Sequence, residues 1–447
     1  MTRMDIILTI AGLCLYIPFI VQCCSTHWDK SSWMKQLLLL LLLLQGTSIL
    51  HIPSVMYVSS SILAVYVLVY SLFHRQDFRW TPMLTLTMLY IGWFAVSLCW
   101  SAVPLKGMLF LMDTGLPMIV FSIMGCAVTI TREERISLFR NGCYAGLIFI
   151  SMTLISWLLC CFQTGTPLNE WPFFAKAMVQ DHLTYDWVFR WLGGMEGYTH
   201  PSYNLLPLFF IIGAATWLRK KREIKAWVWW TLWAGSVSVT LVSQSRMGIL
   251  FACIEIIAYI VYIQFTLRRQ VFTAVSIAIV GLTVIGLTFS FWTQYGSDSI
   301  RDTLHTYTIR YIQAKPWTGA GAGALNPIEM CHTIGVEEWP HIGHIAPDAK
   351  VEEWQPKTRM LPHNQWLADW AHAGMVAAVL CMAVYICLII RCIRMRRVPE
   401  GLFLLIFCIF SYLEPPLYIG KGLYLFGLIG AWLYMYRERE EQAAGDA

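Results

Sequence analysis

Residues 55–73 read VMYVSSSILAVYVLVYSLF, a run of nineteen residues without a charged side chain that ends two positions before Arg75. As an α-helix, a run of this length crosses the roughly 30 Å hydrocarbon core of a bilayer. Similar runs recur along nearly the whole chain, and 57% of the 447 residues are apolar whereas only 13% are charged. Soluble domains carry about 25% charged residues. The sequence therefore predicts an all-α, polytopic integral membrane protein.

The apolar runs predict twelve or thirteen transmembrane helices. No small-residue cleavage site follows the first run, so we interpret it as a retained span and not as a signal peptide. The Leu37–Leu44 stretch, broken by Gln45, Gly46 and Pro53, is the best candidate for a half-inserted segment, which would leave twelve spans and a cytoplasmic N-terminus. The runs lie at 4–22, 36–50, 55–73, 82–100, 109–130, 142–161, 202–218, 226–242, 247–266, 271–291, 364–390, 401–413 and 416–436.

The basic residues between the runs fall into six clusters. Two predicted spans separate each consecutive pair of clusters, so the positive-inside rule places all six, and the C-terminus, in the cytoplasm. The segments 162–201 and 292–363 are then extracytoplasmic loops of one membrane domain, 1–447. The clusters are Arg75 and Arg79; Arg132, Arg135 and Arg140; Arg219, Lys220, Lys221, Arg222 and Lys225; Arg268 and Arg269; Arg391, Arg394, Arg396 and Arg397; and Arg437 and Arg439.

The composition argues against several other classes. The net charge of +5 is divided among these clusters, so no nucleic-acid partner is expected. Nearly all of the fourteen cysteines lie inside apolar runs and none forms a C-x-x-C pair, which is unlike a disulfide framework or a zinc ribbon. Cys331 with His332, His341 and His344 matches no standard zinc spacing. We expect no metal and no cofactor.

Arg246 is the first candidate for chemistry. It ends the sequence SQSR, residues 243–246, between two apolar runs with almost no connecting loop. Its guanidinium must therefore sit at the outer boundary of the membrane, where an arginine is costly unless it is matched. A guanidinium is suited to bidentate binding of a diphosphate. The alternative is snorkelling to lipid headgroups.

The outer segment 292–363 holds further candidates. The polar stretch Asp298–Arg310 predicts an amphipathic helix on the membrane surface. Residues 316–323, PWTGAGAG, have alternating glycines that permit positive φ and close backbone approach to something bulky. His363 stands where the chain re-enters the membrane; it can hold or take a proton there, or it can be an ordinary solvated histidine.

These residues in this order resemble the O-antigen ligase and O-antigen polymerase superfamily, over a core of about 195–390. The family pattern has an S-R pair at an outer helix end and then an arginine followed by P-x-x-G-x-G. An H-N-x-x-L motif comes next and opens a helix that has a glycine about three turns on. The matching residues here are Ser245 and Arg246, then Arg310, Pro316, Gly319 and Gly321, then His363, Asn364, Leu367 and Gly374.

The resemblance implies an inverting, metal-independent glycosyltransferase of the bacterial inner membrane with its active site facing the periplasm. It would transfer a glycan from undecaprenyl diphosphate to a sugar hydroxyl of lipid A core or of a nascent polysaccharide. At matching positions, Arg246 and Arg310 would bind the donor diphosphate. His363 would orient or deprotonate the acceptor hydroxyl. The resemblance does not separate ligase from polymerase, and we favour ligase slightly.

Other polar residues at the same boundary are candidates for the acceptor side or for support of the site. Glu414 has a simpler partner in Lys421, and a polar residue inside a helix bundle can serve packing alone. A polysaccharide flippase or other transporter is the competing function, but it predicts two similar halves, which the sequence lacks. The further candidates are Glu196, His200, Asn364, Asp369 and Glu414.

Overall fold

The computed structural model describes residues 13–28, 32–50, 53–164, 202–243, 248, 251–252, 254–255, 299–325, 327–335 and 362–435. Within these ranges every regular element is a helix and there is no strand, which confirms the all-α prediction. Five helical segments in this part of the chain are long and apolar enough to cross a membrane: Val55–Phe73, Pro82–Trp100, Pro104–Ala127, Arg132–Ile155 and Gln365–Arg394. The total of twelve spans stays a prediction.

Most predicted spans coincide with a helix of the structure. Those at 247–266 and 271–291 fall largely or wholly outside the described residues, as do residues 4–12 of the first span. The α-helices are α2 (Ile17–Ser25), α3 (Trp33–Ile49), α4 (Pro53–Phe73), α5 (Pro82–Val96), α6 (Pro104–Phe110), α7 (Leu116–Ala127), α8 (Arg132–Thr164), α11 (Ser202–Lys220), α12 (Ala226–Ser243), α15 (Ser299–Ala314), α16 (Pro327–Ile334), α17 (Gln365–Arg394), α18 (Val398–Leu413) and α19 (Gly420–Met435). Short 3₁₀ turns lie at Ser97–Trp100 (η2) and Pro416–Tyr418 (η7).

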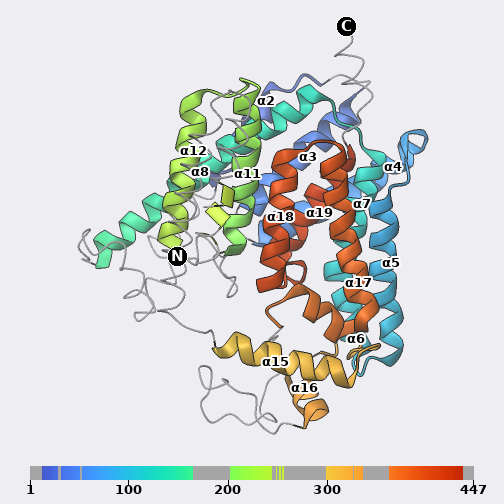
Figure 1. The fold of residues 1–447 in the computed structure, drawn as a ribbon. Helices are drawn as coiled ribbons and strands as arrows, with labels where there is room; N and C mark the ends of the chain where they lie inside the picture. Colours follow the sequence, from blue (N-terminus) through green and yellow to red (C-terminus); the bar gives the residue numbers. More distant parts are fainter. Residues whose placement is uncertain are drawn as a thin grey trace.

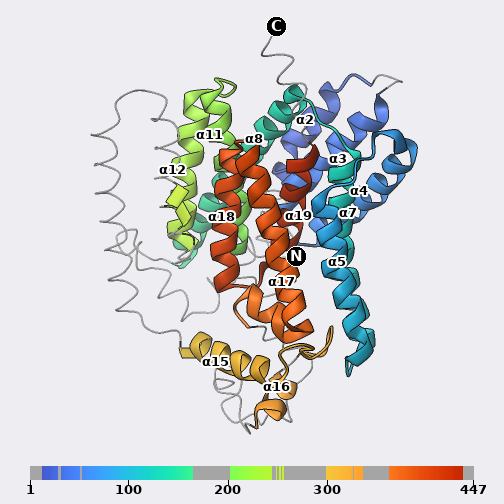
Figure 2. The same ribbon diagram turned by 45° about the vertical axis from the view of Figure 1, so that its right-hand side comes forward.

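The long helices form a bundle around α17, α18 and α19, and α15 and α16 lie across one end of it (Figure 1). The turn between α11 and α12, the turn between α17 and α18 and the C-terminal end of α19 all lie at the opposite end (Figures 1 and 2). These are places where basic residues cluster. The arrangement therefore agrees with the expectation that these clusters share one side of the membrane.

The polar residues of α3 do not break it. The helix continues through Gln45 and Gly46, because α4 supplies a partner: the Ser59 hydroxyl donates to Oε1 of Gln45 at 2.8 Å. The Thr47 hydroxyl donates to the carbonyl of Leu43 within α3 at 2.9 Å. Buried polar groups paired in this way are compatible with an apolar bundle. α3 is therefore one continuous helix through Gln45 and Gly46, and half-insertion of the Leu37–Leu44 stretch stays a prediction.

Candidate active site

His363 and Glu414 meet at the end of the bundle that carries α15. His363 stands two residues before α17 and Glu414 directly follows α18. His363 Nδ1 lies 2.9 Å from Glu414 Oε2. A carboxylate only accepts, so Nδ1 carries the hydrogen and the Nε2 lone pair is left as a proton acceptor. The histidine side chain is 36% exposed and the glutamate only 6%, so a buried carboxylate holds a histidine that remains accessible.

Asn364 fixes the start of the helix that follows His363. Its side-chain oxygen accepts from the amide of Leu367 at 3.0 Å, which satisfies one of the unpaired amides of the first turn. Its Nδ2 donates to the carbonyl of Tyr412 at 3.0 Å. This accounts physically for the H-N-x-x-L spacing. Both ends of the Asn364 amide are engaged by the protein, and its role on the acceptor side or in support of the site stays a prediction.

The predicted amphipathic helix is present as α15, and it contacts His363. His305 Nε2 lies 3.1 Å from the carbonyl oxygen of His363, which ties α15 to the start of α17. Arg310 lies five residues further along α15 on its exposed face. Within the described part of the chain its guanidinium makes no hydrogen bond or ion pair, and it does not contact His363.

Three of the predicted site residues, Arg246, Glu196 and His200, lie outside the described residues. α12 ends at Ser243, three residues before Arg246. That end of α12 is the one away from the basic turn between α11 and α12. Their places in the site therefore stay predictions.

Asp369 is buried and lies near the active-site end of α17. Its Oδ1 accepts three hydrogen bonds: from the Tyr90 hydroxyl at 3.0 Å, the Tyr418 hydroxyl at 2.8 Å and Gln365 Nε2 at 3.0 Å. These donors come from α5, η7 and α17 itself. Asp369 therefore joins α5, η7 and the start of α17 through these bonds, and its part in the site stays a prediction.

The glycine-rich run approaches the chain's own backbone. α17 is kinked at Ala373 and Gly374, and a kink deprives nearby carbonyls of their helical donors. The carbonyls of Ala371 and His372 accept instead from the amide of Ala320 at 2.9 Å and that of Gly321 at 2.7 Å. We predicted close approach to something bulky; Gly319 approaches α17, Gly321 approaches Ser101, and Gly323 approaches α6.

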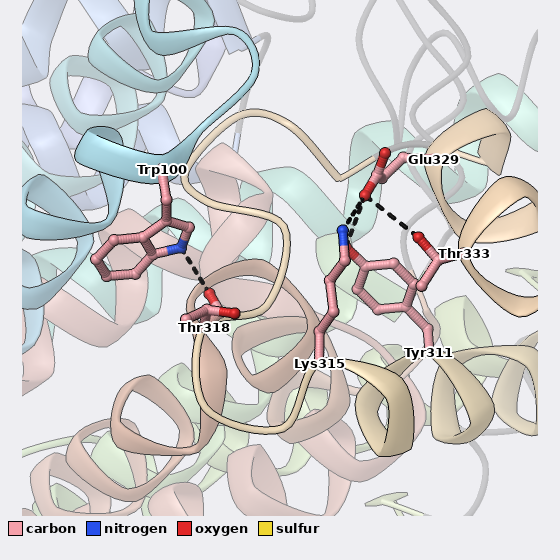
Figure 3. Close-up of polar contacts among 6 residues, drawn as sticks. All are labelled: Trp100, Tyr311, Lys315, Thr318, Glu329 and Thr333. Carbon is pink, nitrogen blue, oxygen red and sulfur yellow. Dashed lines mark hydrogen bonds and ion pairs between the residues drawn. The ribbon is translucent and has the colours of Figure 1, made fainter.

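Side-chain contacts hold this loop at Thr318 and at Lys315, the residue just before it (Figure 3). The indole nitrogen of Trp100, in η2, donates to the carbonyl of Thr318 at 2.8 Å. Glu329 Oε1, in α16, accepts hydrogen bonds from three side chains: one from α15, one from the turn after α15 and one from α16 itself. Burial, followed by the neighbouring Glu329, raises the pKa of the Tyr311 hydroxyl. The three donors are Lys315 Nζ at 2.6 Å, Tyr311 at 3.3 Å and Thr333 at 3.3 Å.

The packing of α16 on α15 can be tested through Cys331. This residue is fully buried in a cluster with Leu304 and Tyr311, and burial raises the pKa of its thiol to about 11. Because only the thiolate reacts, we expect Cys331 to be alkylated at pH 8 at least about 10-fold more slowly than the exposed Cys99. The folded protein is alkylated in detergent for different times, and mass spectrometry of its peptides measures both rates. Equal rates would show that α16 is not packed as described.

The residues that hold this site together were in part missed by the sequence analysis. His305 was included only as one polar residue of the predicted surface helix. Gln365 lies inside the HNQWL sequence, four residues before Asp369. Residues four apart on a helix are neighbours, and this spacing could have identified the pair.

Residues 230–382 match a family model described as O-antigen ligase. The O-antigen ligase resemblance is confirmed. The matched segment includes Arg246, Arg310 and His363, whereas Glu414 lies beyond it. No curated protein matches the chain. The O-antigen ligase match supports glycan transfer as the general function, and together with the membrane-spanning helices it fits a bacterial membrane protein.

Proposed function

We propose that this O-antigen ligase-type chain transfers a glycan from undecaprenyl diphosphate to a sugar hydroxyl on the periplasmic face of the bacterial inner membrane. The observation that carries the proposal is the His363–Glu414 pair. The pair lies beside the start of α17 and the end of α18, and both of these helix ends are opposite the basic turns between α11 and α12 and between α17 and α18 (Figure 1). By the positive-inside rule these ends face the periplasm.

In this proposal His363 is the general base, and its contact with Glu414 supports the role. The acceptor hydroxyl oxygen attacks the anomeric carbon of the donor as the bond from that carbon to the diphosphate oxygen breaks. His363 Nε2 takes the hydroxyl proton, and Glu414, bonded to Nδ1, stabilises the resulting imidazolium. The diphosphate leaves with the bonding electron pair. Attack opposite the leaving group inverts the anomeric carbon.

Two arginines are proposed to bind the donor. A diphosphate gains negative charge as it leaves, and fixed guanidinium groups stabilise that charge most strongly in the transition state. Arg310 fits this role because it is exposed on α15, the helix that also contacts His363 through His305. Arg246 is proposed to bind the same diphosphate, because it occupies the arginine position of the S-R pair in the family pattern. The arginines and the histidine together require no metal.

Complementation of a deletion strain tests the proposal. Wild type is expected to restore surface polysaccharide on silver-stained gels, whereas Arg246→Ala, Arg310→Ala and His363→Ala are expected to fail. Loss of a general base costs about 10²–10⁴-fold in rate, and loss of a transition-state donor about 10²–10³-fold. Arg394→Ala is the matched control, because Arg394 is exposed at the opposite end of α17 and its loss should leave the polymer unchanged.

The same gels separate the possible reactions. Products with a single repeat in the inactive strains indicate a polymerase, and long polymer that stays bound to the lipid carrier indicates a ligase. Immunoblots of membranes establish that each variant accumulates normally. Full complementation by all three variants would contradict the assigned roles and would favour transport.

A further inference from the structure

Hydrogen bonds from the first two turns of α17 hold the segment that carries Glu414. Asn364 Nδ2 donates to the carbonyl of Tyr412, two residues before Glu414. The amide of Leu417, three residues after Glu414, donates to Oε1 of Gln365 at 2.9 Å. The Tyr418 hydroxyl donates to Oδ1 of Asp369 at 2.8 Å. The segment 412–418 is thus fastened on both sides of Glu414.

The sequence of this segment explains why the fastening comes from outside it. Glu414 is followed by Pro415 and Pro416, and proline has no amide hydrogen to donate. Leu417 therefore has the first backbone donor after Glu414, and that donor is used on Gln365. The Leu417 amide and the Gln365 side chain are both buried. No other described group takes this amide.

Asp369 sets the orientation of the Gln365 amide. Gln365 Nε2 donates to Asp369 Oδ1 at 3.0 Å, so its oxygen is turned toward Leu417. Oδ1 of Asp369 also receives the hydroxyls of Tyr90 and Tyr418, which fixes its own position. An amide side chain is required at residue 365, because it must accept from one neighbour and donate to the other.

We propose that Gln365 and Asp369 are positioning residues that hold Glu414 in hydrogen-bonding distance of His363. The inference rests on the proposed function, since it assigns them a role in the same transfer reaction. Neither residue touches His363. They act by fixing the backbone at Leu417 and Tyr418, which follow Glu414 in the chain. A displacement of about 1 Å at a catalytic group can cost about 10²-fold in rate.

The test is steady-state kinetics of the full-length protein in nanodiscs, with a lipid-linked glycan donor and a glycan acceptor. Gln365→Met keeps the volume and removes both hydrogen bonds; its kcat is expected to fall about 10–100-fold with the donor KM within about twofold, because the arginines that bind the donor are untouched. Asp369→Leu should behave alike. Asp369→Asn should retain most of the wild-type kcat that Asp369→Leu loses, since asparagine keeps an acceptor oxygen.

Tyr385→Phe is the matched control for a purely structural effect. The Tyr385 hydroxyl and the Ser411 hydroxyl form a buried hydrogen bond of 2.9 Å between α17 and α18, outside the 412–418 segment. Its loss is expected to lower the melting temperature as Gln365→Met does but to leave kcat unchanged. If Gln365→Met yields no folded protein, Gln365→Glu replaces it; this variant can accept from Leu417 but presents an oxygen to Asp369, and the same loss of kcat is expected.

A double-mutant cycle with Glu414→Gln shows whether Gln365 acts through Glu414. We expect Gln365→Met to change kcat little in the Glu414→Gln background. A full additional loss in that background, or wild-type kcat for folded Gln365 variants, overturns the inference. Failure of the proposed function looks different: wild type would transfer no glycan, or His363→Ala would be as active as wild type.

Discussion

Replacing Gly374 with alanine is expected to prevent folded protein from accumulating. Gly374 has φ 79° and ψ 179°, a conformation that costs other residues about 1–3 kcal/mol. A Cβ at this position would also overlap the carbonyl oxygen of Trp317. That oxygen belongs to the backbone, so it cannot be moved by rotating a side chain. The combined cost should exceed about 4 kcal/mol, a large part of the roughly 5–15 kcal/mol that stabilises a domain.

The loop against Gly374 cannot retreat without further losses. The amide of Met375 donates to the carbonyl of Pro316 at 3.0 Å, and the indole of Trp370 donates to the same oxygen at 2.8 Å. On the other side, Gly319 has φ 60°, and a Cβ there would come within 2.6 Å of the Ala371 carbonyl oxygen. Moving the loop would leave these partly buried groups without their partners, which costs free energy for each of them.

The measurement is the yield of monodisperse protein in detergent and its melting temperature. Gly92→Ala is the control, because Gly92 lies within α5 and a Cβ there meets nothing within 4 Å; helix propensity favours alanine at such a position by roughly 0.5–1 kcal/mol. Wild-type yield and melting temperature for Gly374→Ala would show that the α17 kink does not exist as described.

The sequence predicted the helices well because apolar runs and basic turns are encoded by neighbouring residues. A bilayer demands long apolar runs, and the basic residues between them mark turns, so α4, α17 and α18 begin or end within a few residues of the predicted bounds. The glycine run also carried a correct local signal, that of close backbone approach. Its partner could not be predicted, because the Ala371 and His372 carbonyls become available only when α17 kinks.

The active-site geometry required contacts between distant segments. The family pattern drew attention to His363 and Arg310, but the pairing of His363 with Glu414 joins residues 51 positions apart. The sequence analysis named only Lys421 as a simple partner for Glu414, because a contact across 51 positions leaves no local pattern. The place of Arg310 on the exposed face of α15 follows from which face of that helix packs, and this also depends on tertiary structure.

Arg135 has a structural role that its place in a basic cluster did not predict. It was counted among the basic residues that mark a cytoplasmic turn, and its side chain is only 2% exposed. Its Nη2 forms an ion pair with Oε1 of Glu400, from α18. The guanidinium carbon also lies 4.5 Å from the ring centre of Trp217 and 5.2 Å from that of Phe139. Such contacts with aromatic faces favour a desolvated arginine.

Replacing Arg135 with methionine is therefore expected to lower the free energy of unfolding by about 3–5 kcal/mol, because Glu400 is left buried without its partner. Unfolding of the detergent-solubilised protein by a denaturant measures the change. The control is Arg140→Met in the same helix: the Arg140–Glu223 pair is 3.2 Å long with side chains 42% and 31% exposed, and such pairs contribute about 0–1 kcal/mol.

The double variant, Arg135→Met with Glu400→Met, separates two quantities: the net contribution of the ion pair to the stability of the protein, and the cost of leaving one charge buried alone. Two charges removed from water are repaid only in part by their attraction, so replacing both with apolar side chains of similar volume is often close to neutral. We expect the double variant to be more stable than either single variant. If the loss of stability in the double variant equals the sum of the losses in the two single variants, each charge is stabilised by other contacts. In that case the aromatic rings around Arg135 would be the main source of its stability.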